Sequence, residues 1–245
     1  MRLACVSLMV VLTAMGAAAE PSALVGTDFS AWRGDTGTWL QVGDASLDPA
    51  NEKKLTSKAG TGAALNGPDG HTAHLISKKE WGDVVVSLDF MVPKKSNSGV
   101  YLQGRYEIQV LDSWGVEEVG HYDCGGIYQR YDDAKPEGER GYEGVPPKVN
   151  ASKKPGEWQH FKISFRAPRF DASGKKIAPA AFIKVMHNGK KVHGYTELTG
   201  PTRASRFNDE KALGPLMLQG DHGPVAYRNI VVTPKDFRKT IRTKK

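Results

Sequence analysis

The chain is 245 residues long, 39% of its residues are hydrophobic, and its formal net charge at pH 7 is +7. This length is enough for one large domain with a substantial core, and two cysteines are too few for a disulfide-stabilised scaffold. The lysines stand mostly in pairs at turn-like positions, not on one face interleaved with aromatic residues. The positive charge therefore does not indicate nucleic-acid binding.

The first nineteen residues have the pattern of a secretory signal peptide. Arg2 supplies a positive charge, residues 3–15 are apolar, and the three alanines at 17–19 form a small-residue cleavage site. The apolar run is short for a bilayer span, and no second long apolar run follows it. An uncleaved anchor is the alternative, and the alanines favour cleavage. We therefore expect a signal peptide over 1–19 and an exported protein, periplasmic or secreted, without membrane insertion after cleavage.

Cleavage would remove Cys5 and leave Cys124 as the one remaining cysteine. No intramolecular disulfide is then possible, so the stability of the mature chain must come from core burial. A lone thiol within "YDCGGIY" is either a nucleophile or a small buried hydrophobe, and the second use is the commoner one. We expect Cys124 to be buried.

Short runs that alternate in hydrophobicity recur along the chain, separated by clusters of Gly, Pro, Asn and Asp. Such alternation is typical of β-strands, and convincing amphipathic helices are scarce. The clearest runs are, in chain order, "WGDVVVSLDFMVP" (81–93), "YLQGRYEIQVLD" (101–112), "EWQHFKISFRAP" (157–168), "AAFIKVMHNGKKVHGY" (180–195) and "PLMLQGDHGPVAYRNIVVTP" (215–234). The pattern predicts one all-β domain, a sandwich or barrel, over residues 20–245.

The residues between and within these runs make further local predictions. Asn188-Gly189 between two β-like segments is a strong hairpin signal, and we expect His187 at the edge of that hairpin. The sequence Gly-Asp-His-Gly at 220–223 predicts a turn between two strands. The stretch from Tyr131 to Glu157 is rich in Pro, Gly and charge, and we expect a long irregular loop that is functional or mobile.

The run at 101–112 is interpreted as one strand with an apolar face and a polar face. One parity holds Leu102, Tyr106, Ile108 and Val110, which we expect to face the core. The other parity holds Tyr101, Gln103, Arg105, Glu107 and Gln109. Gly104 could introduce a bulge that breaks this row. By periodicity alone, such a polar row is most often a solvated face.

Several strings taken together resemble the 3-keto-disaccharide hydrolase domain family. They are "DFSAWRGDTGTWLQVGDASL" (28–47), "WGDVVVSLDFMVPKKSNSGVYLQGRYEIQVLDSWG" (81–115), "CGGIYQRY" (124–131), "PPKVNASKKPGEWQHFKISFRAPRFDASGK" (146–175), "HNGKKVHGYTELTGPT" (187–202) and "GPLMLQGDHGPVAYRNIVV" (214–232). The resemblance implies a concanavalin/laminarinase-like jelly roll of two antiparallel sheets with a concave groove that faces carbohydrate. It also implies export in bacteria and action on glycosides whose sugar has been oxidised to a 3-ketone.

A 3-ketone acidifies the proton on carbon 2 of the sugar. A base can then remove that proton, the aglycone leaves carbon 1 by β-elimination, and water adds to the enone. Such a site needs a general base and a donor, cation or metal to hold the developing enolate oxygen. An acid that protonates the leaving oxygen would complete it.

The polar residues of two runs supply the candidates for these roles. His222 is the preferred base because an unperturbed imidazole titrates near neutral pH, and Glu107 is the rival base, an orienting group or a metal ligand. Candidate substrate-binding residues are Gln103, Arg105, Gln109, Tyr101, Tyr128, Gln219 and Asp221, with Trp114 as a further aromatic residue that could stack on a sugar. A divalent metal is possible, and its candidate ligands are His121, Asp123 and Glu107.

Two other functions fit the same fold. A carbohydrate-binding module would have the same groove without turnover, and the chain lacks the compact acidic cluster of laminarinase-type glycosidases. A conventional β-glucan hydrolase needs a second carboxylate within about 5–10 Å of the first, and "EIQVLD" offers only Glu107 and Asp112. We expect a carbohydrate substrate in all three cases.

Overall fold

The computed structural model describes residues 20–24, 28–67 and 69–238, so the predicted signal peptide over 1–19 lies outside the described residues. The described chain is built of β-strands and contains no α-helix. The strands are β1 (Ser22–Ala23), β2 (Leu40–Asp48), β3 (Asn51–Leu65), β4 (Leu75–Trp81), β5 (Val84–Met91), β6 (Asn97–Leu102), β7 (Tyr106–Leu111), β8 (Arg130–Tyr131), β9 (Gly141–Tyr142), β10 (Gln159–Arg166), β11 (Arg169–Phe170), β12 (Lys176–Ala178), β13 (Ala180–His187), β14 (Lys190–His193), β15 (Thr196–Leu198), β16 (Gly214–Leu218) and β17 (Ala226–Pro234). A search of the same residues for a helix of membrane-spanning length and hydrophobicity finds none.

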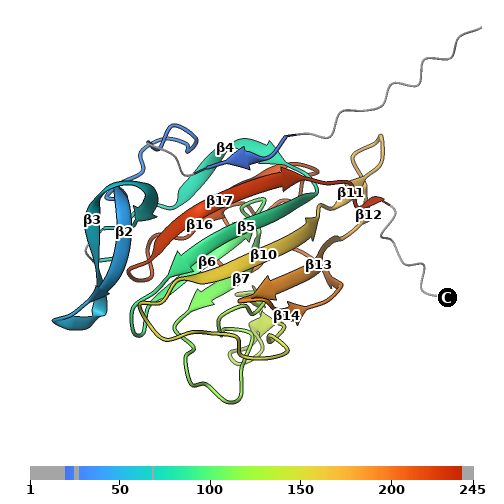
Figure 1. Ribbon diagram of the computed structural model, residues 1–245. Coiled ribbons are helices and arrows are strands. Elements are labelled where there is room, and N and C mark those ends of the chain that lie inside the picture. Colours follow the sequence, from blue (N-terminus) through green and yellow to red (C-terminus); the bar gives the residue numbers. More distant parts are fainter. Residues whose placement is uncertain (1–19, 25–27, 68, 239–245) are drawn as a thin grey trace, which may run out of the picture.

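Two antiparallel sheets face each other, with β5, β10 and β17 in one layer and β6, β7 and β16 in the other (Figure 1). The larger sheet has nine strands in the order β14-β13-β10-β5-β17-β3-β2, with β1 paired to β17 and β15 to β13. The smaller sheet has four strands in the order β4-β16-β6-β7. Neighbours in both sheets are often distant in sequence, which is typical of a jelly roll. The predicted all-β sandwich of two antiparallel sheets is confirmed.

The core lies between the sheets, where the two predicted inward faces meet. Val86, Leu88 and Phe90 of β5 are fully buried, and the ring of Phe90 stacks on Phe161 of β10 with centroids 4.7 Å apart. The opposite layer contributes the apolar parity of the 101–112 run, Leu102, Tyr106, Ile108 and Val110, each at most 2% exposed. Burying a large apolar side chain stabilises the fold by about 1.5–3 kcal/mol, so these residues fix which face of each strand points inward.

The prediction of a single strand over 101–112 is wrong, because the chain reverses direction at Gln103 and Gly104. Both residues have positive φ, 55° and 65°, and the Arg105 N–H donates to the Leu102 carbonyl at 3.0 Å. Glycine adopts this conformation freely, whereas a non-glycine residue there is strained. The Gln103 amide offsets that strain by donating to two backbone carbonyls, those of Trp81 and Ala212, each at 3.1 Å.

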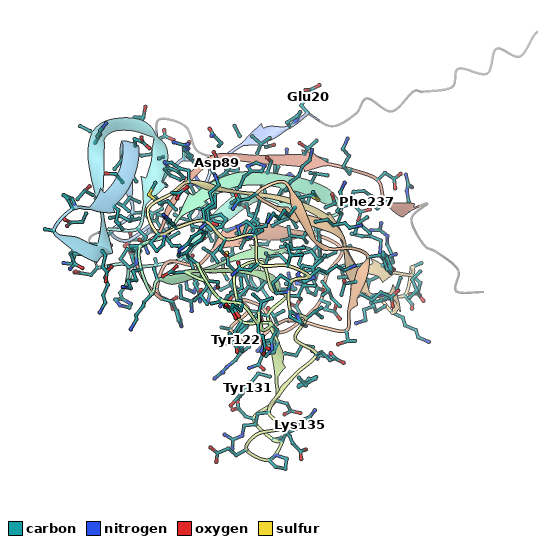
Figure 2. All side chains as sticks on the ribbon, turned by 60° about the horizontal axis from the view of Figure 1, so that its bottom comes forward. Glu20, Asp89, Tyr122, Tyr131, Lys135 and Phe237 are labelled. Carbon is teal, nitrogen blue, oxygen red and sulfur yellow. The ribbon has the colours of Figure 1, made fainter. Side chains whose placement is uncertain are left out.

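Three local predictions remain: the hairpin turn at Asn188-Gly189, the loop over 131–157 and the position of His187. The hairpin at Asn188-Gly189 joins β13 to β14, with φ of 48° and 79° at the two turn residues. Residues 131–157 are largely irregular, although β8 and β9 form a small hairpin that carries Lys135 away from the sandwich (Figure 2). His187 flanks the Asn188-Gly189 turn and is paired with Lys190, as predicted, but its side chain is not at the surface. It pairs with the inward-facing Phe161 and is fully buried, and burial lowers its pKa to about 3.

Candidate active site

The register of the four-stranded sheet lines up one row of side chains on the face turned away from the core. Tyr101 of β6 is paired with Met217 of β16 on one side and with Glu107 of β7 on the other. A bridge between Ile108 and Ile127 extends the sheet by one more segment, which places Tyr128 beside Glu107. The hairpin therefore brings Tyr101 and Glu107 together as neighbours across two strands, not as distant members of one strand.

The Glu107 carboxyl is buried at the centre of this row. The residue is 2% exposed, and its side chain lies directly above the Cα of Gly99, where a β-carbon would overlap Glu107 Oε1. Burial raises the pKa of Glu107 to about 8; a hydrogen bond with the Tyr101 side chain opposes this shift and the charge of Asp221 adds to it. Burial and the neighbouring Glu107 also raise the pKa of Tyr101 well above its usual range. Both groups therefore hold their protons at neutral pH.

Asp221 and His222 follow β16 at the end of the sheet nearest to Gly99. The Asp221 Oδ1 atom lies 2.5 Å from His222 Nδ1, and the Gln219 amide nitrogen lies 3.3 Å from the same ring nitrogen. The His222 side chain is 51% exposed. In the tautomer that donates its Nδ1 proton to this carboxylate, the lone pair of Nε2 is free to accept a proton.

The turn that carries this pair is held by residues that the sequence analysis missed. Asn66 is fully buried; its amide donates to the carbonyls of Gly220 and Gly223 at 3.1 and 2.8 Å, and its oxygen accepts the Val225 N–H at 2.8 Å. His74 accepts the Gly220 N–H at 3.2 Å. These contacts join positions more than 140 residues apart, so no local pattern could have found them.

Gln103 and Arg105, two predicted substrate-binding residues, are occupied by contacts within the protein. Arg105 is 2% exposed, its guanidinium pairs with Asp209 at 2.5 Å, and it stacks on the Phe207 ring at 4.7 Å. Gln103 binds two backbone carbonyls, as described above. The two residues anchor the segment 199–213 against the end of the four-stranded sheet.

Three other predicted residues, Gln109, Tyr128 and His121, occupy the remaining part of the face. Gln109 is 5% exposed and is paired with Gly99, and the Tyr128 ring lies 5.9 Å from the ring of His121. Asp123 does not join them. Its carboxylate accepts from the Ser113 hydroxyl at 2.8 Å and from the Gly120 N–H at 2.7 Å, so it shapes the loop before β8.

The predicted metal ligands are not gathered into one cluster. Over the described residues, no group of three or more His, Cys, Asp or Glu side chains is placed to hold a metal ion. Asp123 is committed to the loop, and Glu107 to Tyr101. Cys124 is 1% exposed and burial raises its pKa to about 12, which confirms its predicted role as a buried hydrophobe.

Two cavities flank this face. One of about 580 Å³ includes His74, Ile76 and Asp221 in its lining. The other, of about 280 Å³, opens at the sandwich edge beside Tyr128, where the segment around Gly144 approaches β15. Volumes of this size are ordinary for small-ligand sites.

The chain matches one protein family over almost its whole described length. Residues 21–233 match the 3-keto-alpha-glucoside-1,2-lyase-like domain, which confirms the resemblance inferred from the sequence motifs. No protein of curated function matches the chain.

Solved structures of Parabacteroides distasonis proteins are similar to the chain. One, described as a candidate glycosyl hydrolase, is 25% identical, with 88% of this chain and 84% of that chain covered and a TM-score of 0.60. A second protein of the same description is 20% identical, with 89% and 100% covered and a TM-score of 0.54. At that identity the second likeness supports the fold alone.

Proposed function

We propose that this chain, which belongs to the 3-keto-alpha-glucoside-1,2-lyase-like domain family, is an enzyme that cleaves the glycosidic bond of 3-keto-glycosides. Its family and its relatives place it among carbohydrate-active proteins. The observation that carries the proposal is the placement of a buried, protonated carboxyl and an exposed Asp–His pair on one sheet face. Pairs of titratable groups with opposite environments are typical of acid–base catalysis.

His222 acts as the base in this proposal. Its Nε2 takes the proton from carbon 2 of the sugar, and the electron pair of the C–H bond forms the enolate with the 3-ketone. Asp221, at 2.5 Å from Nδ1, orients the ring and stabilises the imidazolium that forms. General-base catalysis of this kind contributes about 10²–10⁴-fold to a rate.

Glu107 acts as the acid, and Tyr101 acts as a hydrogen-bond donor. When the enolate collapses, the ketone re-forms, a double bond forms between carbons 1 and 2, and the bond from carbon 1 to the leaving oxygen breaks. A carboxyl whose pKa is raised to about 8 is protonated at neutral pH and can deliver its proton to that oxygen. The Tyr101 hydroxyl beside it can hold the developing enolate oxygen. Water then adds to the enone, and the net reaction is hydrolysis.

A product assay tests the proposal. The protein is incubated with a 3-keto-disaccharide and with the same disaccharide unoxidised, each with and without a chelator. We expect release of the second sugar from the oxidised substrate alone, with a transient enone absorbance, and unchanged rates in the presence of chelator. Loss of turnover with chelator would move the electrophilic role from Tyr101 and Glu107 to a metal.

The same assay separates the rival functions. Saturable glycan binding without release of either sugar would favour a binding module, and release from unoxidised β-glucan would favour a conventional hydrolase. Inactivity on both oxidised and unoxidised substrates, with any added divalent metal, would overturn the enzyme proposal.

Export is part of the proposal, and the alanines at 17–19 support it. When the 245-residue chain is expressed in a bacterial host, the protein should be recovered from the periplasm or medium with Glu20 as its first residue. Recovery of uncleaved chain from the membrane fraction would contradict export as a soluble protein.

A further inference from the structure

The cavity of about 580 Å³ lies on the same face as the proposed reacting groups. Its lining includes Ile76 of β4, which is paired with Met217 and therefore belongs to the cross-sheet row of Tyr101 and Glu107. Asp221 forms part of the lining as well. The cavity thus adjoins the site at Asp221 and extends away from Glu107, toward β4.

The opposite wall comes from the segment 199–213, which Arg105 anchors. Phe207 lines the cavity, and its ring is held in place by the Arg105 guanidinium at 4.7 Å. Arg206 lines it too and is exposed. Burial lowers the pKa of His74, and the positive charge of Arg206 lowers it further, so the guanidinium lies near the His74 ring.

The charges of the lining suit an uncharged ligand. Arg33 and Arg206 are matched by Asp35 and Asp221, and Arg33 already pairs with Glu80 at 2.6 Å. A phosphate or a uronate would need an excess of cations, which the lining does not supply. Planar polar side chains beside an aromatic ring can instead hydrogen-bond the hydroxyl groups of a pyranose and cover its C–H face.

We infer that this cavity binds the leaving sugar, the aglycone ring of a 3-keto-disaccharide, and that Arg206 and Phe207 set the preference for it. The inference rests on the proposed function. In the proposed reaction, carbon 2 of the oxidised ring lies near His222, whose side chain is exposed beside Asp221. The ring attached through the oxygen on carbon 1 then lies to one side, and the space beyond Asp221 is this cavity.

The test compares a 3-keto-glucosyl-glucose with a methyl 3-keto-glucoside, which lacks the second ring. For R206A and F207A we expect kcat/KM on the disaccharide to fall about ten-fold, mainly through KM, and kcat/KM on the methyl glycoside to change less than about two-fold. R203A is the matched control, because Arg203 is in the same segment but stacks on Tyr131 at 3.9 Å, outside the cavity. It should leave both substrates unchanged.

Glucose binding by calorimetry gives an answer that does not depend on turnover. Wild type and R203A should bind glucose, and R206A should bind it at least about ten-fold more weakly. An equal loss on both substrates, no loss on either, or glucose binding unaffected by R206A would overturn the inference. If wild type binds glucose but cleaves neither oxidised substrate, the proposed function fails while the sugar site stands.

Discussion

The two outward faces of the sandwich carry similar residues but differ in what those residues can do. On the nine-stranded sheet, Asp89 (labelled in Figure 2) accepts from His160 Nδ1 at 2.7 Å, and His160 Nε2 lies 3.4 Å from the Ser87 hydroxyl. These three groups have the order of a Ser-His-Asp triad. On the four-stranded sheet, the charge of Asp221 acts on Glu107 and Tyr101, and Asp221 is paired with His222 at 2.5 Å.

Solvation separates the two faces. Burial raises the pKa of Asp89, but hydrogen bonds from His160, Asn229 and Arg228 outweigh it, and the net pKa is lowered. Glu107 is more deeply buried, the hydrogen bond with Tyr101 does not outweigh that burial, and its pKa is raised to about 8. Residue types and spacing alone therefore do not make a site. The segments 112–130 and 199–213, which cover one face, create the environment that changes the chemistry.

The largest effect should come from removing the proposed base. H222A should lower kcat/KM on a 3-keto-disaccharide about 1,000-fold, because the variant lacks the imidazole that takes the proton in the proposed reaction. H160A is the matched control from the other face and should stay within about two-fold of wild type. Equal losses in the two variants would remove the distinction between the faces. Circular dichroism should show the same fold for both.

Replacing the proposed acid should have the next largest effect. E107Q keeps the shape of a protonated carboxyl but cannot donate a proton, so kcat/KM should fall about 100-fold. Wild-type activity should also decline above about pH 8, as Glu107 loses its proton. That decline should be absent from the residual activity of E107Q. If E107Q lost activity above about pH 8 as steeply as wild type does, a group other than Glu107 would control the decline.

The raised pKa of Glu107 also predicts a pH dependence of stability. The folded state binds this proton up to about pH 8, whereas the ordinary pKa of a glutamate side chain is 4.5. The resulting stabilisation is full below pH 4.5 and is lost as the pH rises through 8, a change of up to about 5 kcal/mol. Urea unfolding at pH 5 and pH 8.5 measures it. Wild type should lose more stability than E107Q over this range, and equal losses would contradict the raised pKa.

The sequence predicted the elements of the fold because strand periodicity and hairpin signals are local. The inward faces of β5, β7 and β10 and the turn at Asn188-Gly189 followed from hydrophobic alternation and from residues that tolerate positive φ. The period of two also misled, since it continued through the turn at Gln103 and hid a hairpin as one strand.

The site was only partly predictable, because its geometry depends on contacts between distant segments. Motif resemblance singled out Glu107 and His222, whose roles stay predictions. Nothing local showed that Asn66 would hold the turn at 220–223, or that Arg105 would bind Asp209 and not a ligand. A polar side chain on a strand faces solvent unless a loop covers it, and the sequence does not show which loop does so.

A smaller effect should follow from displacing the Glu107 carboxyl without removing it. A β-carbon at position 99 would overlap Glu107 Oε1, so G99A should move the carboxyl and lower kcat/KM about ten-fold. G194A is the control, since a β-carbon there meets nothing within 4 Å. Activity of G99A equal to that of G194A would show that the position of the carboxyl does not matter.

The smallest effect on activity should come from the triad-like group on the nine-stranded sheet. S87A and D89N should leave turnover of the 3-keto-disaccharide within about two-fold of wild type. D89N should instead change stability, because the pH dependence of the stability that Asp89 contributes has the opposite sign to that of Glu107. Because the folded pKa of Asp89 is lowered, its stabilisation is present above its ordinary value of 3.8 and is lost as the pH falls through the folded pKa. Since Asp89 is partly exposed, the loss in D89N at pH 7 should be under about 1 kcal/mol and should shrink toward pH 3. If D89N were instead to gain stability at neutral pH, the hydrogen bonds of Asp89 would not outweigh its burial. The pKa shifts of the carboxyl groups on the two faces would then differ in size but not in sign.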